Sequence, residues 1–205
     1  MTQAKTKLFI IGGGGHSRVV IDSFRKSGSQ IDGIVDPAYA KCEIVVGIPV
    51  IGGDEVLDTF SIDAIRLING VGVLPGHLGR WKITERLRNR GFKFVTVIDP
   101  DAVVSSRVKV SEGVQVLAGC ILQDGVTIGR DSVVNTGVIL DHDCNLGEKC
   151  WISPGVTICG GTTIGSNAYI GTGATLIQNI RIGEGALIRA GTVVVEDVPP
   201  RTILK

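Results

Sequence analysis

The chain has 205 residues, of which 43% are hydrophobic, 20% are charged and 4% are aromatic, and its formal net charge is +1. This near-neutral balance excludes a strong overall attraction to nucleic acid or to an acidic membrane surface, so any anion site has to be local. No apolar run reaches the roughly 20 residues that a transmembrane helix needs, and no segment resembles a signal peptide. The five cysteines include no Cys-x-x-Cys pair, which argues against a disulfide framework or a zinc knuckle. We therefore expect a cytoplasmic protein with reduced thiols, no nucleic-acid partner and no membrane insertion.

The first 98 residues predict strands that alternate with helices. Apolar strands are expected at residues 8–11, 31–35, 64–68 and 92–97, and helices at residues 17–26, 54–60 and 76–90. This alternation is typical of a parallel sheet. The unit resembles half of a doubly wound nucleotide-binding fold, so we predict a Rossmann-like domain over residues 1–98.

A run of four glycines at residues 12–15, followed by His16, comes directly after the first strand. Without Cβ atoms the backbone can turn tightly and approach a ligand, and the N-terminus of the next helix suits a phosphate. Asp36 ends the second strand, where a carboxylate can bond a ribose or a base edge. The spacing is not a regular G-x-G-x-x-G and a second mononucleotide half is missing, so we do not expect a full dinucleotide site. A purely structural turn remains the alternative.

The second half of the chain, residues 99–205, repeats every six residues. The repeat places an aliphatic residue at Val104, Val110, Val116, Leu122, Ile128, Val134, Leu140, Leu146, Ile152, Ile158, Ile164, Ile170, Leu176, Ile182, Ile188 and, as a sixteenth position, Val194. Four residues after each of these comes a second set of mostly small residues, among them Cys120, Cys144 and Cys150. This is the hexapeptide repeat of a parallel β-helix. With three repeats to a triangular coil, we predict about five coils without a long loop and with these three cysteines in the interior.

His142 is the only one of the three histidines that lies in the repeat. It comes two residues after the inward-facing Leu140, so we expect its side chain to point outward, with Asp141 and Asp143 on either side. Acyl transfer needs a base that takes the proton of the nucleophile, and imidazole suits this because its pKa is near neutral. One coil is eighteen residues, so Gly160 is expected beside His142, where its N–H could stabilise an oxyanion. An ordinary surface histidine is the alternative, and either carboxylate could orient the ring.

With these features together, the chain resembles the NeuD family of sugar acyltransferases, and within it the PglD-type enzymes that acetylate nucleotide-linked amino-sugars. The resemblance covers almost the whole chain. Its motifs are the stretches IIGGGGH at residues 10–16 and IDPDA at residues 98–102, the Asn135-Thr136 pair before His142, and the hexapeptide repeats. One departure is Ser17, where a smaller residue is common in the family.

The resemblance implies a left-handed β-helix over residues 99–205, a homotrimer with active sites between subunits, and acetyl-CoA as the co-substrate without a metal. His142 would be the general base and Asp143 its carboxylate partner. Acetyl-CoA would lie along the outer groove of the prism, and we expect it to contact Gly160, Asn135, Gly161, Ile170, Gly173 and Ala190. The front domain would bind the nucleotide-sugar through Gly13, Gly14, Gly15, His16, Asp36, Asn69 and Gly70.

The substrate implied is a UDP-, GDP- or dTDP-linked sugar with a 4-amino group. The same histidine would serve an attacking hydroxyl, so O-acetylation of sialic acid or a related sugar stays open as the alternative. A zinc hydratase on a similar prism needs three histidine ligands, whereas the repeat contains one. A sugar-nucleotide pyrophosphorylase needs a much larger preceding domain, and the Asp-His-Asp cluster argues against a catalytically silent scaffold.

Overall fold

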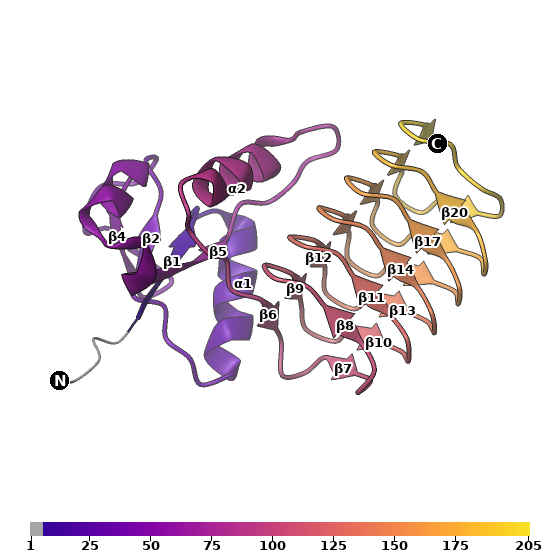
Figure 1. Ribbon diagram of the computed structural model, residues 1–205, viewed down its shortest axis with the longest axis horizontal. Coiled ribbons are helices and arrows are strands. Elements are labelled where there is room, and N and C mark those ends of the chain that lie inside the picture. The colour runs from indigo at the N-terminus through magenta and orange to yellow at the C-terminus, as the bar shows by residue number, and fades with distance from the viewer. Residues whose placement is uncertain (1–5) are drawn as a thin grey trace. The chain divides into compact units, whose positions relative to one another are not determined.

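The computed structural model describes residues 6–205 and consists of two compact units, Met1–Val95 and Thr96–Lys205 (Figure 1). The first combines helices with a sheet, and the second is a stack of coils built from strands of two residues. None of the helices found in the described residues has the length and apolar content needed to cross a bilayer.

The first unit is organised around a five-stranded sheet in the order β3-β4-β2-β1-β5. Its strands are β1 (Lys7–Ile11), β2 (Gly33–Val35), β3 (Ile44–Val45), β4 (Ile48–Gly52) and β5 (Ile65–Asn69). All neighbours pair in parallel except β3 and β4, which form an antiparallel hairpin. The predicted parallel sheet is confirmed, and the first three predicted strands are present with ends shifted by one or two residues.

Helices lie on both faces of this sheet. They are α1 (Gly15–Lys26), α2 (Gly79–Asn89) and the 3-10 helices η1 (Asp54–Thr59) and η2 (Ile62–Ala64). Side chains alternate along a strand, and Phe9 and Ile11 of β1 share one apolar cluster with Leu57 of η1 and Leu87 of α2. Ile10 points to the other face, where α1 buries its own apolar side. The carboxyl ends of β1, β2 and β5 therefore meet at one edge of a two-sided sheet.

One hairpin of this unit was not predicted, and one predicted strand was wrong. The β3–β4 hairpin was missed because its turn residues, Val46 at φ +51° and Gly47 at φ +73°, have left-handed backbone, as in type I′ turns. A β-branched residue is rarely found in that conformation, so a valine at position 46 does not indicate a turn in the sequence. The predicted strand 92–97 is also divided: Phe94 bridges to Leu67 in the first unit, whereas Val97 pairs with Gln115 in the second unit.

The second unit is a left-handed β-helix with three faces, each a parallel sheet whose neighbouring strands are eighteen residues apart. Face 1 contains β7 (Val103–Val104), β10 (Ile121–Leu122), β13 (Ile139–Leu140), β16 (Thr157–Ile158), β19 (Thr175–Leu176) and β22 (Val193–Val194). Face 2 contains β8 (Lys109–Val110), β11 (Thr127–Ile128), β14 (Asn145–Leu146), β17 (Thr163–Ile164) and β20 (Arg181–Ile182). Face 3 contains β6 (Val97–Ile98), β9 (Gln115–Val116), β12 (Val133–Val134), β15 (Trp151–Ile152), β18 (Tyr169–Ile170), β21 (Leu187–Ile188) and β23 (Ile203–Leu204). The predicted six-residue repeat is confirmed as far as Val194.

The inward-facing set fills the prism, as the sequence predicts. From Val116 to Ile188 the repeated aliphatic residues are at most 2% exposed and form one continuous cluster. Cys120, Cys144 and Cys150 belong to that cluster and are fully buried. Burial raises the pKa of their thiols to about 11, about 11 and about 12 respectively. These three cysteines are therefore packing residues that stay protonated at neutral pH.

Candidate active site

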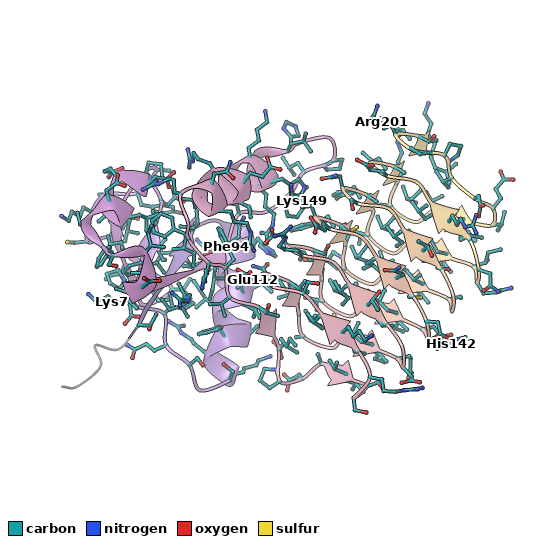
Figure 2. The ribbon with its side chains drawn as sticks, in the orientation of Figure 1. Lys7, Phe94, Glu112, His142, Lys149 and Arg201 are labelled. Atoms are coloured by element: carbon teal, nitrogen blue, oxygen red, sulfur yellow. The ribbon has the colours of Figure 1, made fainter. Side chains whose placement is uncertain are left out.

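The turn that carries His142 joins face 1 to face 2, and the turns of successive coils are stacked at this corner, which we call corner 1–2. The N–H of Asp143 donates to the carbonyl of Asp124 in the coil before (2.9 Å), and the N–H of Gly161 in the coil after donates to the carbonyl of His142 (2.9 Å). Residue 142 is therefore fixed on both sides by backbone hydrogen bonds. Its side chain points outward and is 64% exposed (Figure 2).

The two aspartates beside His142 have different roles in the structure. Asp143, at φ +58°, directs its carboxylate back at the ring, so that Oδ2 lies 3.0 Å from Nδ1 of His142. Asp141 instead accepts the backbone N–H of His142 at 2.8 Å. The hydrogen bond with Asp143 is the main cause that raises the pKa of His142, and the charge of Asp141 adds to it. When Nδ1–H donates to Asp143, the lone pair is on Nε2, which is the nitrogen required of a base.

Gly160 lies directly against Nε2 of His142. A Cβ at this position would be 2.5 Å from Nε2, which only a glycine avoids without moving the ring. Among the contacts of residues 6–205, the N–H of Gly160 donates to no other group. The corner therefore places a basic nitrogen next to an available backbone donor, as the eighteen-residue coil predicts.

The remaining residues expected to bind acetyl-CoA are divided between two corners. Gly161 follows Gly160 at corner 1–2, whereas Asn135, Gly173 and Ala190 lie at the corner between face 3 and face 1. Asn135 is 5% exposed, and its amide donates to the carbonyl of Ile152 at 2.7 Å.

Ile170 is a correction to the expected set. Its side chain is fully buried inside the prism, because it occupies the inward position of its hexapeptide. It cannot line an outer groove with its side chain, so any contact of this residue with a bound molecule has to go through its backbone.

In the first unit, Asp36 organises the glycine turn after β1. Its Oδ2 accepts the N–H of Gly13 at 2.8 Å, and its Oδ1 accepts the N–H of Ala38 at 2.9 Å. Gly14 is the N-cap of α1 and Gly15 its first residue, and a Cβ on either would meet nothing within 4 Å. The turn therefore leaves open space in front of the helix N-terminus, which is the environment an anionic group prefers.

His16, Asn69 and Gly70 are less open than the glycines at positions 14 and 15. His16 is half-buried in the first turn of α1. Asn69 is 5% exposed, and its amide donates to Thr84 Oγ1 at 2.8 Å while its carbonyl oxygen accepts the N–H of Val71 at 2.9 Å. Gly70 is buried, and a Cβ there would be 2.9 Å from Ile10. Asn69 and Gly70 therefore shape the turn after β5 and offer no side chain to a ligand.

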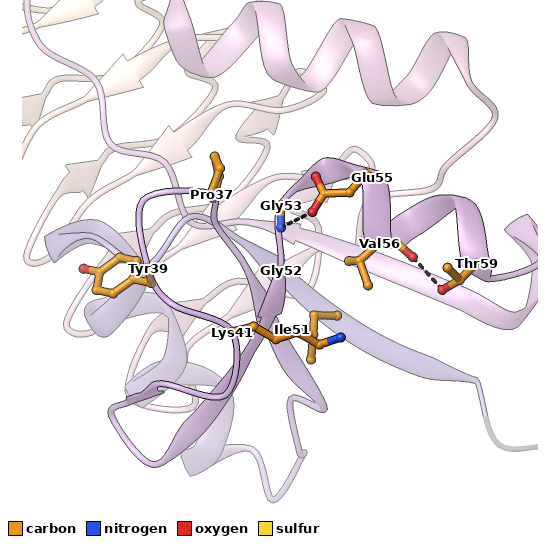
Figure 3. Close-up of a pocket in the computed structure, with 9 residues that line it drawn as sticks. All are labelled: Pro37, Tyr39, Lys41, Ile51, Gly52, Gly53, Glu55, Val56 and Thr59. Carbon is orange, nitrogen blue, oxygen red and sulfur yellow. Dashed lines mark hydrogen bonds between the residues drawn. The ribbon is translucent and has the colours of Figure 1, made fainter.

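Two pockets open beside this glycine turn. One of about 380 Å³ lies at the carboxyl ends of β1 and β2 and is lined by Ile11, Gly12, Val35, Asp36, Pro37, Asp54, Val71, Ile83 and Arg86. The other, of about 450 Å³, is lined by Pro37, Tyr39, Lys41, Ile51, Gly52, Gly53, Glu55, Val56 and Thr59 (Figure 3). Ligands of open α/β sheets bind outside the carboxyl ends of the strands, which makes this edge the candidate nucleotide site.

Sequence reasoning missed the residues that the loop after β2, the helix η1 and the helix α2 contribute to this edge. The hydroxyl of Tyr39 donates to the carbonyl of Gly13 at 3.1 Å, and its ring packs against that glycine. Glu55 accepts the N–H of Gly53 at 2.9 Å, as Figure 3 shows. Arg86 forms an ion pair with Asp54 at the first pocket. The only signal for Tyr39 was its position three residues after Asp36.

Comparison with known proteins agrees with both halves of this structure. Residues 7–87 match the PglD N-terminal domain, and residues 143–178 match the bacterial transferase hexapeptide family (six repeats). A point mutant of perosamine N-acetyltransferase from Caulobacter crescentus, solved with CoA and GDP-perosamine, is 38% identical with a TM-score of 0.87 over 95% of this chain and 90% of that one.

The acetyltransferase domain of PglB from Neisseria gonorrhoeae, solved with acetyl coenzyme A, is 34% identical with a TM-score of 0.87 over 96% of this chain and 94% of that one. The chain belongs to the PglD/NeuD-type sugar acetyltransferases. WeeI from Acinetobacter baumannii, at 23% identity and a TM-score of 0.86, shares the fold over 97% of this chain and 96% of its own. No curated protein sequence matches the chain. Membership of this PglD/NeuD-type family makes the protein an acyltransferase.

Proposed function

We propose that this PglD/NeuD-type enzyme transfers the acetyl group of acetyl-CoA to the 4-amino group of a nucleotide-linked deoxysugar. Two observations on relatives support it: the enzyme at 38% identity was solved with CoA and GDP-perosamine, and the one at 34% with acetyl coenzyme A. The observation on this chain that carries the proposal is the exposed side chain of His142, with Asp143 at Nδ1 and Gly160 beside Nε2.

In the proposed mechanism the acetyl group passes directly from sulfur to nitrogen. Nε2 of His142 removes a proton from the amine, whose nitrogen attacks the thioester carbonyl. The N–H of Gly160 donates to the oxyanion of the tetrahedral intermediate. The carbon–sulfur bond then breaks, and the thiolate takes the proton from the imidazolium. The products are the amide and CoA, and Asp143 stabilises the imidazolium in between.

The assembly we propose is a homotrimer whose active sites lie between neighbouring prisms. Its support is the division of the expected acetyl-CoA contacts between two corners of one prism. A groove between two copies would bring corner 1–2 of one prism to the other corner of its neighbour. Sedimentation equilibrium measures the mass of the assembly directly. Each chain has a mass of 21.6 kDa, so a measured mass that differs from three times this value would contradict the homotrimer.

The deciding experiment for the reaction measures CoA release across a panel of UDP-, GDP- and dTDP-linked 4-amino-sugars together with free sialic acid. We expect turnover with one nucleotide-amino-sugar and a loss of about 10²–10⁴-fold in kcat in His142→Ala. His77→Ala is the matched control, since His77 is an exposed histidine of the first unit. Turnover with sialic acid alone would replace N-acetylation by O-acetylation. Near-normal activity of a folded His142→Ala enzyme would overturn the mechanism.

A further inference from the structure

The carboxylate of Asp143, which contacts His142, packs against the turn of the preceding coil. The N–H of Asp143 donates to the carbonyl of Asp124, and the side chain of Asp143 extends over the next residue, Gly125. A Cβ on Gly125 would be 2.5 Å from Oδ1 of Asp143 and 3.4 Å from its Cγ. The carboxylate therefore occupies the volume that a side chain at position 125 would fill.

The two oxygens of this carboxylate have separate surroundings. Oδ1 faces Gly125, while Oδ2 lies 3.0 Å from Nδ1 of His142. A side chain at position 125 would push on Oδ1 and rotate the carboxylate, which moves Oδ2 away from the ring. The atom that has to yield is the end of an exposed side chain and not backbone. Such a substitution would thus break the His142–Asp143 contact and leave the coil intact.

An ion pair holds the Asp124–Gly125 turn in place. Arg107 lies in the coil before that of Asp124. Its Nε donates to Oδ1 of Asp124 at 2.6 Å, and a second guanidinium nitrogen pairs with Oδ2. The Ser105 hydroxyl lies 3.5 Å from the same Oδ1. Arg107, two coils before His142, thereby holds the turn against which Asp143 packs.

We propose that Gly125 is a positioning residue of the active site: the absent side chain at position 125 lets Asp143 orient His142. This inference rests on the proposed function, in which His142 is the base. Because Gly125 acts only through Asp143, its substitution has to reproduce the loss of Asp143 and add nothing when Asp143 is already absent.

The pH profile gives a second readout. The titratable groups that act on His142 are Asp141 and Asp143 on its own turn, and from the coils before, the charge of Arg107 acts on Asp143. Of these, Asp143 contributes most to the raised pKa of His142. If Asp143 is displaced, the pKa of His142 falls, and the acid limb of kcat/KM moves to lower pH.

The test compares Gly125→Ala with Gly185→Ala. Both glycines have left-handed backbone, at φ +74° and +66°, so alanine is strained to a similar degree at either position. A Cβ on Gly185, at the corner between face 2 and face 3, would lie 3.6 Å from the nearest atom of Arg201, an ordinary contact. Thermal unfolding of both variants measures the shared strain, and steady-state kinetics measure the difference.

We expect Gly125→Ala to lower kcat at least tenfold relative to Gly185→Ala and to shift the acid limb to lower pH. In an Asp143→Ala background, the two glycine variants should have equal activity. Equal activity in the wild-type background, a multiplicative loss in the Asp143→Ala background, or unfolding of Gly125→Ala alone would each overturn the inference. If His142→Ala stays active the proposed function fails, whereas an inactive His142→Ala with an unaffected Gly125→Ala rejects only the role of Gly125.

Discussion

Replacing Gly160 by alanine tests the contact at the centre of the proposed site. The added Cβ would lie 2.5 Å from Nε2, 2.6 Å from Cε1 and 2.9 Å from Cδ2 of His142, whereas an ordinary contact begins at 3.4 Å. The ring therefore has to retreat by about 1 Å. A misplacement of ~1 Å at a reacting group can lower the rate about 10²-fold, which corresponds to ~2.7 kcal/mol of transition-state stabilisation.

Stability is expected to change little in Gly160→Ala. Gly160 is outside the left-handed region of backbone, and the ring that has to move is 64% exposed. Surface changes of this kind stay within about 0.5 kcal/mol. The alanine also keeps the backbone N–H, so a lost oxyanion donor would not explain a slower enzyme.

The assay is CoA release at saturating substrates, with thermal unfolding of the same samples. Gly79→Ala is the matched control, because Gly79 has ordinary backbone and a Cβ there would meet nothing within 4 Å. We expect kcat of Gly160→Ala to fall about 10²-fold while Gly79→Ala stays near wild type. If Gly160→Ala keeps more than about a third of the wild-type kcat, the ring does not work from the position seen in the structure, and the reasoning from this contact fails.

Three further predictions concern charge, thiols and the glycine turn. Catalysis requires neutral His142, and Asp143 raises its pKa, so Asp143→Asn should move the acid limb of kcat/KM to lower pH; a limb that stays in place would contradict the pairing. In the folded enzyme an alkylating reagent should label the exposed Cys42 and leave the interior thiols of Cys120, Cys144 and Cys150 unmodified, as read by mass spectrometry. Modification of these interior thiols before the protein unfolds would refute their burial. Asp36→Ala removes the acceptor of the Gly13 N–H. The KM for the nucleotide-sugar should therefore rise about tenfold, which corresponds to ~1.4 kcal/mol for one such hydrogen bond, while the KM for acetyl-CoA stays unchanged. Equal changes in both KM values would reject a role of Asp36 in sugar binding.

The prism could be predicted from the sequence because its core is periodic along the chain. A narrow interior accepts one aliphatic and one small residue from each hexapeptide, so every coil repeats the same constraint. The approach of Gly160 to His142 follows from the same arithmetic, since eighteen residues return the chain to the same corner. The structure bears out both expectations: the repeated aliphatic residues from Val116 to Ile188 are at most 2% exposed, and Gly160 lies against the ring of His142.

The differences between the sequence analysis and the structure have two causes: conformations that local sequence does not specify, and one register position that was not applied. The β3–β4 hairpin depends on a left-handed backbone at Val46, a conformation that a β-branched residue disfavours and that accompanies the pairing of β3 with β4. Asn69 and Gly70 follow a strand at the expected ligand edge, and only the structure shows that Asn69 hydrogen-bonds to Thr84 and that Gly70 lies against Ile10. Ile170 was assigned to the outer groove although its own register position points inward.

The sequence by itself determined the two-part architecture, the parallel β-helix and the outward position of His142, because hydrophobic periodicity and coil length act along the chain. Only the tertiary structure decided that Asp143, and not Asp141, contacts the ring. That choice depends on the left-handed backbone of Asp143 and on the space above Gly125, eighteen residues away. Contacts between stacked turns are set by side-chain volumes in neighbouring coils, and these come together only when the prism has formed.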